Sequence, residues 1–135
     1  MVTYERKAFY YETDQMGIIH HSNYIRWFEE ARIDMLDQLG LSYVEMEEKG
    51  IIIPVLSVAC EYKKMTRFGE TVEIKVKFKS YKGVRFSFEY ELWEKESKEL
   101  RCTGETTHCF LTKENQPMNL KKMHPDIYET LMSEL

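Results

Sequence analysis

The chain has 135 residues, of which 43% are hydrophobic and 31% charged, and its formal net charge at pH 7 is -4. This composition is typical of a globular protein, and the length favours one domain over residues 1–135. The negative balance argues against a general nucleic-acid or anionic-membrane surface, although it is compatible with a local basic patch. Because no apolar run approaches the roughly 20 residues of a membrane span and no signal-peptide core precedes the first motifs, we expect a cytoplasmic location.

A first strand is expected over residues 3–11, which alternate loosely and carry aromatic side chains. The stretch after it places an acid, Asp14, ahead of Gly17 and two histidines, His20 and His21, and a helical pattern follows. A helix N-terminus stabilises negative charge because its first N–H groups are unpaired and the helix dipole is positive there. An acid that generates the attacking species, beside a helix end that receives oxyanion charge, indicates acyl-transfer chemistry.

A long amphipathic helix is predicted after this stretch. Ser22 and Asn23 are good N-cap residue types, and Gly40 lies where a left-handed C-cap is expected. The width of its apolar stripe suits a helix that packs on a sheet. The stripe repeats at three- and four-residue steps through Tyr24, Trp27, Phe28, Ala31, Met35, Leu36 and Leu39.

A short second helix is predicted next, because Ser42 and Glu45 have capping-box spacing and Gly50 would close it. The run at residues 51–60 is apolar on both faces, so we interpret it as a central or interface strand. Pro54 cannot donate a ladder hydrogen bond and is expected to mark the start of this strand or a bulge.

Two half-buried antiparallel strands follow, because apolar and polar residues alternate over residues 72–79 and 85–92, with a turn at 81–83. A last strand is expected over residues 99–112, where Gly104 suggests a bulge or a close backbone approach. The tail should end in a short amphipathic helix that opens at a proline.

The predicted order of elements indicates the α+β class, an antiparallel sheet with a single long helix on one face. The two-sided apolar strand leaves an edge that a monomer would expose. We therefore expect at least a homodimer. Cys60, Cys102 and Cys109 have no C-x-x-C spacing and are interpreted as free, buried thiols, while a catalytic thiol is the weaker alternative. Adjacent His20 and His21 lack the spacing of a metal pair.

One string carries a family resemblance: Tyr10-x-Glu12-Thr13-Asp14-x-x-Gly17-x-x-x-His21-x-Asn23-Tyr24, with Trp27-Phe28-Glu29-x-Ala31-Arg32 after it. Together with the order of elements, it resembles the hotdog-fold acyl-CoA thioesterases of the 4-hydroxybenzoyl-CoA thioesterase-like family. The resemblance runs from about Thr3 to about Thr112. It departs from the family pattern at Met65, where a proline is common, and this affects the expected loop and groove shape.

The resemblance implies a hotdog fold, in which an antiparallel sheet wraps around one long central helix, with homodimers or homotetramers and active sites at the dimer interface. By matching positions, Asp14 is the catalytic carboxylate, as general base or nucleophile, and His21 and Tyr10 assist it. No metal and no separate cofactor are implied, since coenzyme A arrives as part of the substrate. Oxyanion or substrate-binding groups are implied at the helix start, at Gly17, Ile18 and Tyr24.

Each of these roles has a structural alternative. Asp14 would also suit a turn, His21 can orient the helix start through a hydrogen bond, and Tyr10 can be a core aromatic residue. His20 is interpreted as a packing or surface residue and His108 as structural. Three cations could meet the 3′-phosphate of coenzyme A or simply form a solvated strand end: Lys63, Lys64 and Arg67.

The function that these residues favour is hydrolysis of an acyl-CoA thioester to a free carboxylic acid and coenzyme A. Aromatic residues around the motif would suit a fatty or aromatic acyl group, although most of them are as compatible with a core. The alternatives are a non-catalytic acyl-CoA binding or sensing module on the same fold, and a hotdog hydratase or dehydratase.

Overall fold

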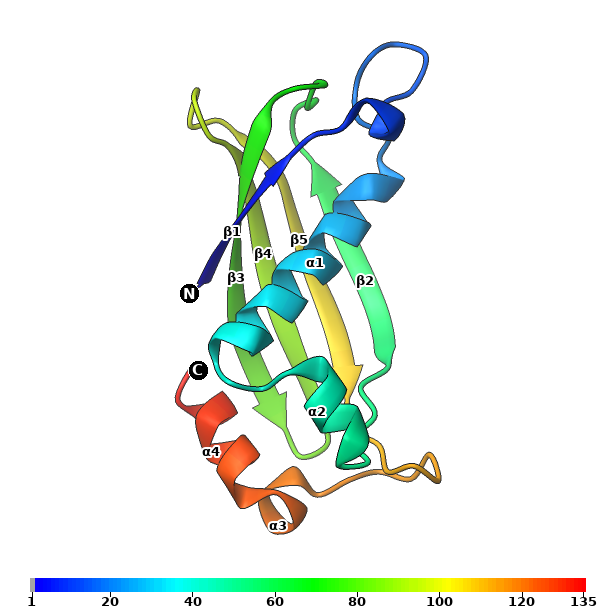
Figure 1. Ribbon diagram of the computed structural model, residues 1–135, viewed down its shortest axis with the longest axis vertical. Helices are drawn as coiled ribbons and strands as arrows, with labels where there is room; N and C mark the ends of the chain where they lie inside the picture. The colour runs from blue at the N-terminus through cyan, green and yellow to red at the C-terminus, as the bar shows by residue number, and fades with distance from the viewer. Residues whose placement is uncertain (1) are drawn as a thin grey trace.

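The computed structural model describes residues 2–135 and contains a five-stranded antiparallel sheet with strand order β1-β3-β4-β5-β2. The strands are β1 (Val2–Lys7), β2 (Val55–Tyr62), β3 (Thr71–Lys82), β4 (Arg85–Glu94) and β5 (Leu100–Cys109). A long helix, α1 (Ser22–Gln38), lies across one face of the sheet (Figure 1). This arrangement confirms the predicted α+β architecture.

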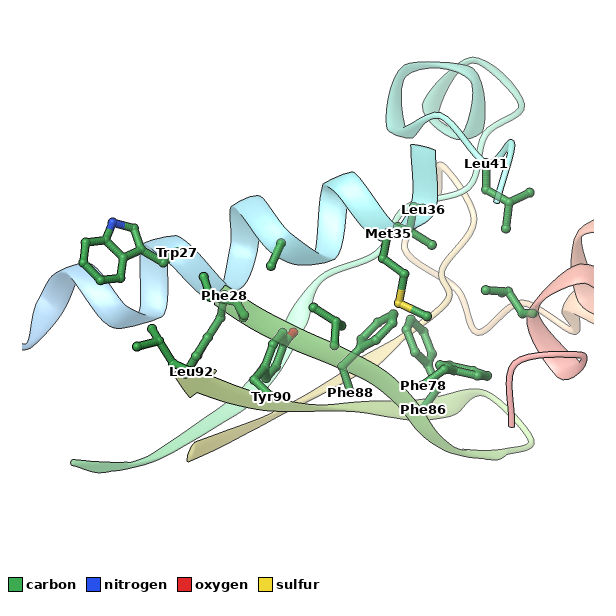
Figure 2. Packing of buried hydrophobic residues seen from close by; sticks show 14 of the residues in the cluster. Trp27, Phe28, Met35, Leu36, Leu41, Phe78, Phe86, Phe88, Tyr90 and Leu92 are labelled. Carbon is green, nitrogen blue, oxygen red and sulfur yellow. The ribbon is translucent and has the colours of Figure 1, made fainter. Parts of the chain in front are cut away.

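The core lies between α1 and the sheet. Trp27 and Phe28 are fully buried, and Figure 2 shows the apolar side of α1 facing strand side chains that include Tyr90 and Leu92. Alternate residues of β3 and β4 point into this core, as their sequence period predicts. Each large apolar side chain that is fully buried contributes about 1.5–3 kcal/mol, so this interface dominates the stability of the fold.

The end of α1 is as predicted. Gly40 has a φ of 77°, and its N–H donates to the Asp37 carbonyl at 3.0 Å. The next N–H, of Leu41, donates to the Leu36 carbonyl at 2.8 Å. These two bonds form a Schellman motif, which needs a residue that tolerates a left-handed backbone.

The start of α1 differs from the prediction. His21 is the N-cap residue, and Ser22 and Asn23 already belong to the helix. The Asn23 side chain is used elsewhere, since its Nδ2 donates to the carbonyls of Glu12 at 2.9 Å and His20 at 3.2 Å. Tertiary bonds to the preceding loop have replaced the local cap.

The first strand is shorter than predicted and ends at Lys7, because residues 10–12 form a 3-10 turn, η1 (Tyr10–Glu12). The apolar run at residues 51–60 is not central: β2 starts at Val55, directly after Pro54, and lies at a sheet edge. Pro54 therefore marks the strand start.

The remaining elements are present, but they differ from the predictions in the absence of a capping box at Ser42, a later β3–β4 turn and an additional short helix. The short helix α2 (Tyr43–Glu48) is preceded by Ser42, whose side chain makes no cap hydrogen bond. The β3–β4 turn falls at residues 83–84, slightly later than predicted. Two short helices end the chain, an unpredicted α3 (Leu120–Met123) and the predicted α4 (Pro125–Met132). Within residues 2–135, no helix has the length and apolar character that crossing a membrane requires.

Gly104 marks a close approach and not a bulge. It pairs regularly with Tyr90 and Cys60 on the two neighbouring strands. A Cβ at this position would overlap the ring of Phe28 and lie 3.1 Å from the Ala59 carbonyl oxygen. The absent side chain lets the Phe28 ring stack on Tyr90, with ring centroids 4.5 Å apart.

Candidate active site

The loop before α1 is a tight turn that holds Asp14. The Asp14 N–H donates to the Ile18 carbonyl at 2.8 Å, and the Gly17 N–H donates back to the Asp14 carbonyl at 3.1 Å. Gly17 has a φ of 76°, which explains the need for glycine here. The Asp14 carboxylate takes part, since its Oδ1 accepts the Met16 N–H at 2.8 Å. Asp14 is therefore a turn residue, as its structural alternative proposed, and this does not exclude a chemical role.

Glu12 anchors the loop to the body of the molecule. Its carboxylate is buried and accepts hydrogen bonds from Arg6, from the Phe9 N–H and from the Trp27 Nε1–H. Burial alone would raise the pKa of this carboxyl, but these hydrogen bonds outweigh it and lower the pKa. No role of Glu12 was predicted from the sequence. Its place in the motif, two residues before Asp14, was the available signal.

A groove of about 960 Å³ opens beside Asp14 and the start of α1. It brings together seven of the residues that the sequence analysis selected. Tyr10 and Gly17 are not among its lining residues, and the Tyr10 side chain is 75% exposed. The groove is lined by Asp14, Ile18, Ile19, His21, Tyr24, Tyr62, Lys63, Lys64, Met65, Arg67, Glu70, Glu99 and Arg101.

Aromatic rings form one wall of this groove. The ring centroid of Tyr62 lies 5.4 Å from that of Tyr24 and 6.1 Å from that of His21. The Tyr62 hydroxyl donates to the His21 carbonyl at 3.4 Å. Burial and the neighbouring Cys60 thiol raise the pKa of Tyr62 to about 12, so its hydroxyl keeps its proton at neutral pH. The sequence analysis did not select Tyr62 as a site residue.

The backbone N–H groups at the helix start differ in their availability. The N–H groups of Ile19 and His20 donate to the carbonyls of Thr66 and Glu12, at 2.8 and 2.9 Å, and Gly17 bonds within its turn. Within residues 2–135, the N–H groups of Ile18 and His21 make no such bond, and both residues line the groove. Two N–H groups of this segment are therefore without a backbone partner in the described part of the chain.

The two histidines are placed differently. The exposed His20 side chain shares a 2.8 Å hydrogen bond between its Nδ1 and the Ser22 Oγ, in agreement with a surface role. Its ring stacks on that of His21 at 4.2 Å. His21 is also exposed and lines the groove.

The predicted phosphate-binding cations are not equivalent. Lys63 forms an ion pair with Glu61 at 3.1 Å, and Lys64 forms one with Glu99 at 3.0 Å. In the described part of the chain, Arg67 has no ion pair within 4 Å. Arg67 is thus the cation with the most freedom to meet an anionic group.

The three cysteines are free, and only Cys60 is half-exposed. A hydrogen bond with Cys102 lowers the pKa of Cys60 to about 7, although burial opposes this shift. Neither thiol lines the groove with Asp14. Over residues 2–135, no cluster of three or more histidine, cysteine or acidic side chains has an arrangement that could hold a metal ion.

Comparisons with known proteins show the family of the chain. The family model of the thioesterase-like superfamily matches residues 10–131, which include Asp14 and most of the fold. The chain belongs to this superfamily, as the sequence motif predicted.

Relatives and solved structures extend this result. The Bacillus subtilis protein named "Putative acyl-CoA thioesterase YneP" is 35% identical over 118 residues, which is 87% of this chain and 85% of the relative. The acyl-CoA thioester hydrolase YbgC of Escherichia coli O6:H1 is 26% identical and aligns over 61% of each chain. The structure of a DHNA-CoA thioesterase from Staphylococcus aureus is 38% identical, with a TM-score of 0.91, and the match covers 97% of this chain and 88% of that one. The predicted hotdog fold is confirmed by this structural match.

Proposed function

We propose that the protein hydrolyses an acyl-CoA thioester to a free carboxylic acid and coenzyme A, with Asp14 as general base or nucleophile. The observation that carries the proposal is the groove itself. Asp14 and His21 both line this groove, His21 is the N-cap residue of a 17-residue helix, and its N–H has no backbone partner within residues 2–135. Thioester hydrolysis needs these two functions together, a group that provides the attack and donors that stabilise the oxyanion.

The reaction follows from these groups. With Asp14 as general base, its carboxylate takes a proton from water, and the resulting hydroxide attacks the thioester carbonyl carbon. With Asp14 as nucleophile, a carboxylate oxygen attacks the same carbon, and water then hydrolyses the mixed anhydride. In both routes the oxyanion is stabilised by the N–H groups of Ile18 and His21, and the C–S bond breaks to release the coenzyme A thiolate. Tyr24 and Tyr62 would contact the acyl group.

An aromatic acyl group is the preferred substrate within the expected fatty or aromatic range. The wall formed by Tyr24, Tyr62 and His21 suits a flat ring, because aromatic rings favour edge-to-face and offset contacts at these separations. The Staphylococcus aureus protein that shares 38% identity is a DHNA-CoA thioesterase, which agrees with this preference. Arg67 is the proposed partner of a coenzyme A phosphate.

The proposed assembly is a homodimer or a homotetramer. The edge strand β2 carries Val55, Leu56 and Val58, all of which are at least 40% exposed in the monomer. An edge with apolar side chains and unpaired backbone groups is a natural pairing surface for a second copy.

A free-thiol assay with a panel of thioesters tests the function. The panel should hold short, long and aromatic acyl-CoAs and an acyl-carrier-protein thioester. We expect release of coenzyme A by the wild-type protein and a loss of roughly 10²-fold or more in kcat for Asp14→Asn, with Asp37→Asn as a matched control on the exposed end of α1. His21→Ala should lower kcat less, by about tenfold, because its N–H remains. Tight binding without turnover would instead support the acyl-CoA sensor, and near wild-type turnover by Asp14→Asn would refute the mechanism.

A further inference from the structure

Arg101 is a buried cation in the wall of the groove, and protein groups occupy its guanidinium. It lies in β5 and is 6% exposed. Nη1 and Nη2 donate to the two carboxylate oxygens of Glu70, each at 3.1 Å. Nη1 also donates to the Met65 carbonyl at 2.6 Å. Nε lies 2.6 Å from Glu99 Oε1 but off the hydrogen-bonding direction, so this is a charge contact only.

The backbone of Arg101 holds the same segment from the other side. Its carbonyl accepts the N–H groups of Lys63 and Lys64, at 2.9 and 3.1 Å. Glu70, which accepts two hydrogen bonds from Arg101, also accepts the Arg67 N–H at 2.6 Å. Residues 63–67 are thus fixed to one β5 residue through both its backbone and its side chain.

This segment in turn supports the loop that carries Asp14. The Thr66 carbonyl accepts the Ile19 N–H at 2.8 Å, and Ile18 forms a β-bridge with Arg67. The Ile18 carbonyl accepts the Asp14 N–H at 2.8 Å. The Arg101 guanidinium is therefore connected to the backbone of Asp14 by hydrogen bonds and the short backbone segments between them, by way of residues 65–67 and 18–19.

We propose that Arg101 is a positioning residue for the hydrolysis reaction, and this inference rests on the proposed function. Arg101 holds residues 65–67 in place, and these hold the Asp14 loop against the helix start. It does not act as a substrate ligand, because Met65 and Glu70 accept the hydrogen bonds of its Nη atoms and Glu99 lies against its Nε. A planar guanidinium is needed, since a lysine ammonium cannot bind both oxygens of Glu70 and the Met65 carbonyl in this geometry.

The test is Arg101→Met, with Arg85→Met as the matched control, because Arg85 is an exposed arginine on the neighbouring strand β4. Hydrogen exchange followed by NMR measures the protection of the loop amides directly. We expect the Asp14 and Ile19 amides to exchange at least tenfold faster in Arg101→Met, while the β4 amides keep their protection. We also expect kcat on the best thioester to fall by about tenfold. The Arg85→Met variant should match the wild type in both measurements.

Several results would overturn the inference. Loop exchange that stays at the wild-type rate would do so, as would faster exchange spread evenly over the whole molecule. Faster loop exchange with an unchanged kcat would show that the site does not depend on Arg101. If Arg101→Met does not fold, Glu70→Gln and Arg101→Lys weaken the same bonds more mildly and should show smaller changes of the same kind. Exchange needs no substrate, so a wild-type protein without thioesterase activity would refute the proposed function separately.

Discussion

Arg6 and Glu12 form a bidentate pair that joins β1 to the loop before α1, with Nη1–Oε1 and Nη2–Oε2 distances of 2.7 and 2.8 Å. Arg6 also reaches Glu30 on α1 through its Nε, at 3.0 Å. The two acids differ in exposure, since the Glu12 side chain is 3% exposed and that of Glu30 is 36% exposed. The three residues thus offer a matched comparison of a buried and an exposed ion pair.

Glu12→Gln should lower the free energy of unfolding by about 3 kcal/mol, because breaking a buried pair leaves a partner charge poorly compensated. Glu30→Gln should cost less than about 1 kcal/mol, as exposed pairs do. The pKa of Glu12 is lowered in the folded state, so its contribution is complete above its ordinary pKa of 4.5 and is lost as the pH falls through the lower folded value. Urea unfolding of both variants at pH 7 and below pH 4 checks this. Equal losses for the two variants would contradict it.

Gly104→Ala should destabilise the fold by about 2–3 kcal/mol, because the added methyl overlaps the Phe28 ring in a packed core. Phe28→Leu removes the ring edge, so the double variant should lose less than the sum of the two single losses. Gly83→Ala, at a turn with open space around it, should show no such coupling to Phe28. Chemical denaturation of six proteins, the wild type, the three single variants and the two double variants with Phe28→Leu, measures the coupling. Strictly additive losses would show that the close approach is unimportant.

The burial of His108 predicts a second, separate effect of pH on the free energy of unfolding. Its ring is fully buried, and its Nε2 lies 2.7 Å from the Thr106 Oγ1. Burial and the charge of Arg32 lower the pKa of His108 to about 4. Its contribution is therefore complete above its ordinary pKa of 6.5 and is lost as the pH falls from 6.5 towards 4, by roughly 3 kcal/mol at most.

The variant His108→Phe should remove this pH dependence between pH 6.5 and 4, whatever its effect at neutral pH. Unfolding free energies at half-unit steps of pH would show it, and Glu12 contributes mainly below this window. An unchanged slope in the variant would mean that another group causes the loss of stability.

The exposed β2 edge predicts an oligomer that a single charge can disrupt. We expect the wild-type protein to scatter light as a particle of at least about 33 kDa, twice the 16.3 kDa of one chain. Val58→Lys should shift it to the monomer, because an unpaired lysine on a pairing edge opposes association. Val44→Lys, which changes an exposed valine on α2, should leave the mass unchanged. A monomeric wild-type protein at micromolar concentration would refute the proposed assembly.

The parts of the fold that were predicted correctly depend on local period. The alternation in β3 and β4 and the stripe of α1 are visible within a few residues, because each element buries one face. For residues 51–60 the sequence left a central and an interface strand open, since residues with two apolar faces look the same whether a neighbouring strand or a second chain covers them. The edge position of β2 excludes only the central alternative. The cap of α1 was wrong for a related reason: the Asn23 side chain bonds to Glu12, 11 residues earlier.

The candidate site was predictable where the motif is continuous in sequence. Asp14, Ile18, His21 and Tyr24 lie within 11 residues of one another, and all four line the groove. Arg101 was not found, because its proposed role rests on bonds to Met65 and Glu70, which lie 36 and 31 positions away. A single sequence contains no local signal for such distant pairs.

The groove and the C-terminal helices lie at opposite ends of the molecule. The loop before α1, which holds Asp14, is at the top of Figure 1, whereas α3 and α4 are at the bottom and the C-terminus lies in the lower half of the view. A linker attached after Leu135 would therefore leave the molecule in the half that is away from the Asp14 loop. Immobilisation on a sensor surface, or fusion to a reporter, through this end would keep the attachment away from the Asp14 loop.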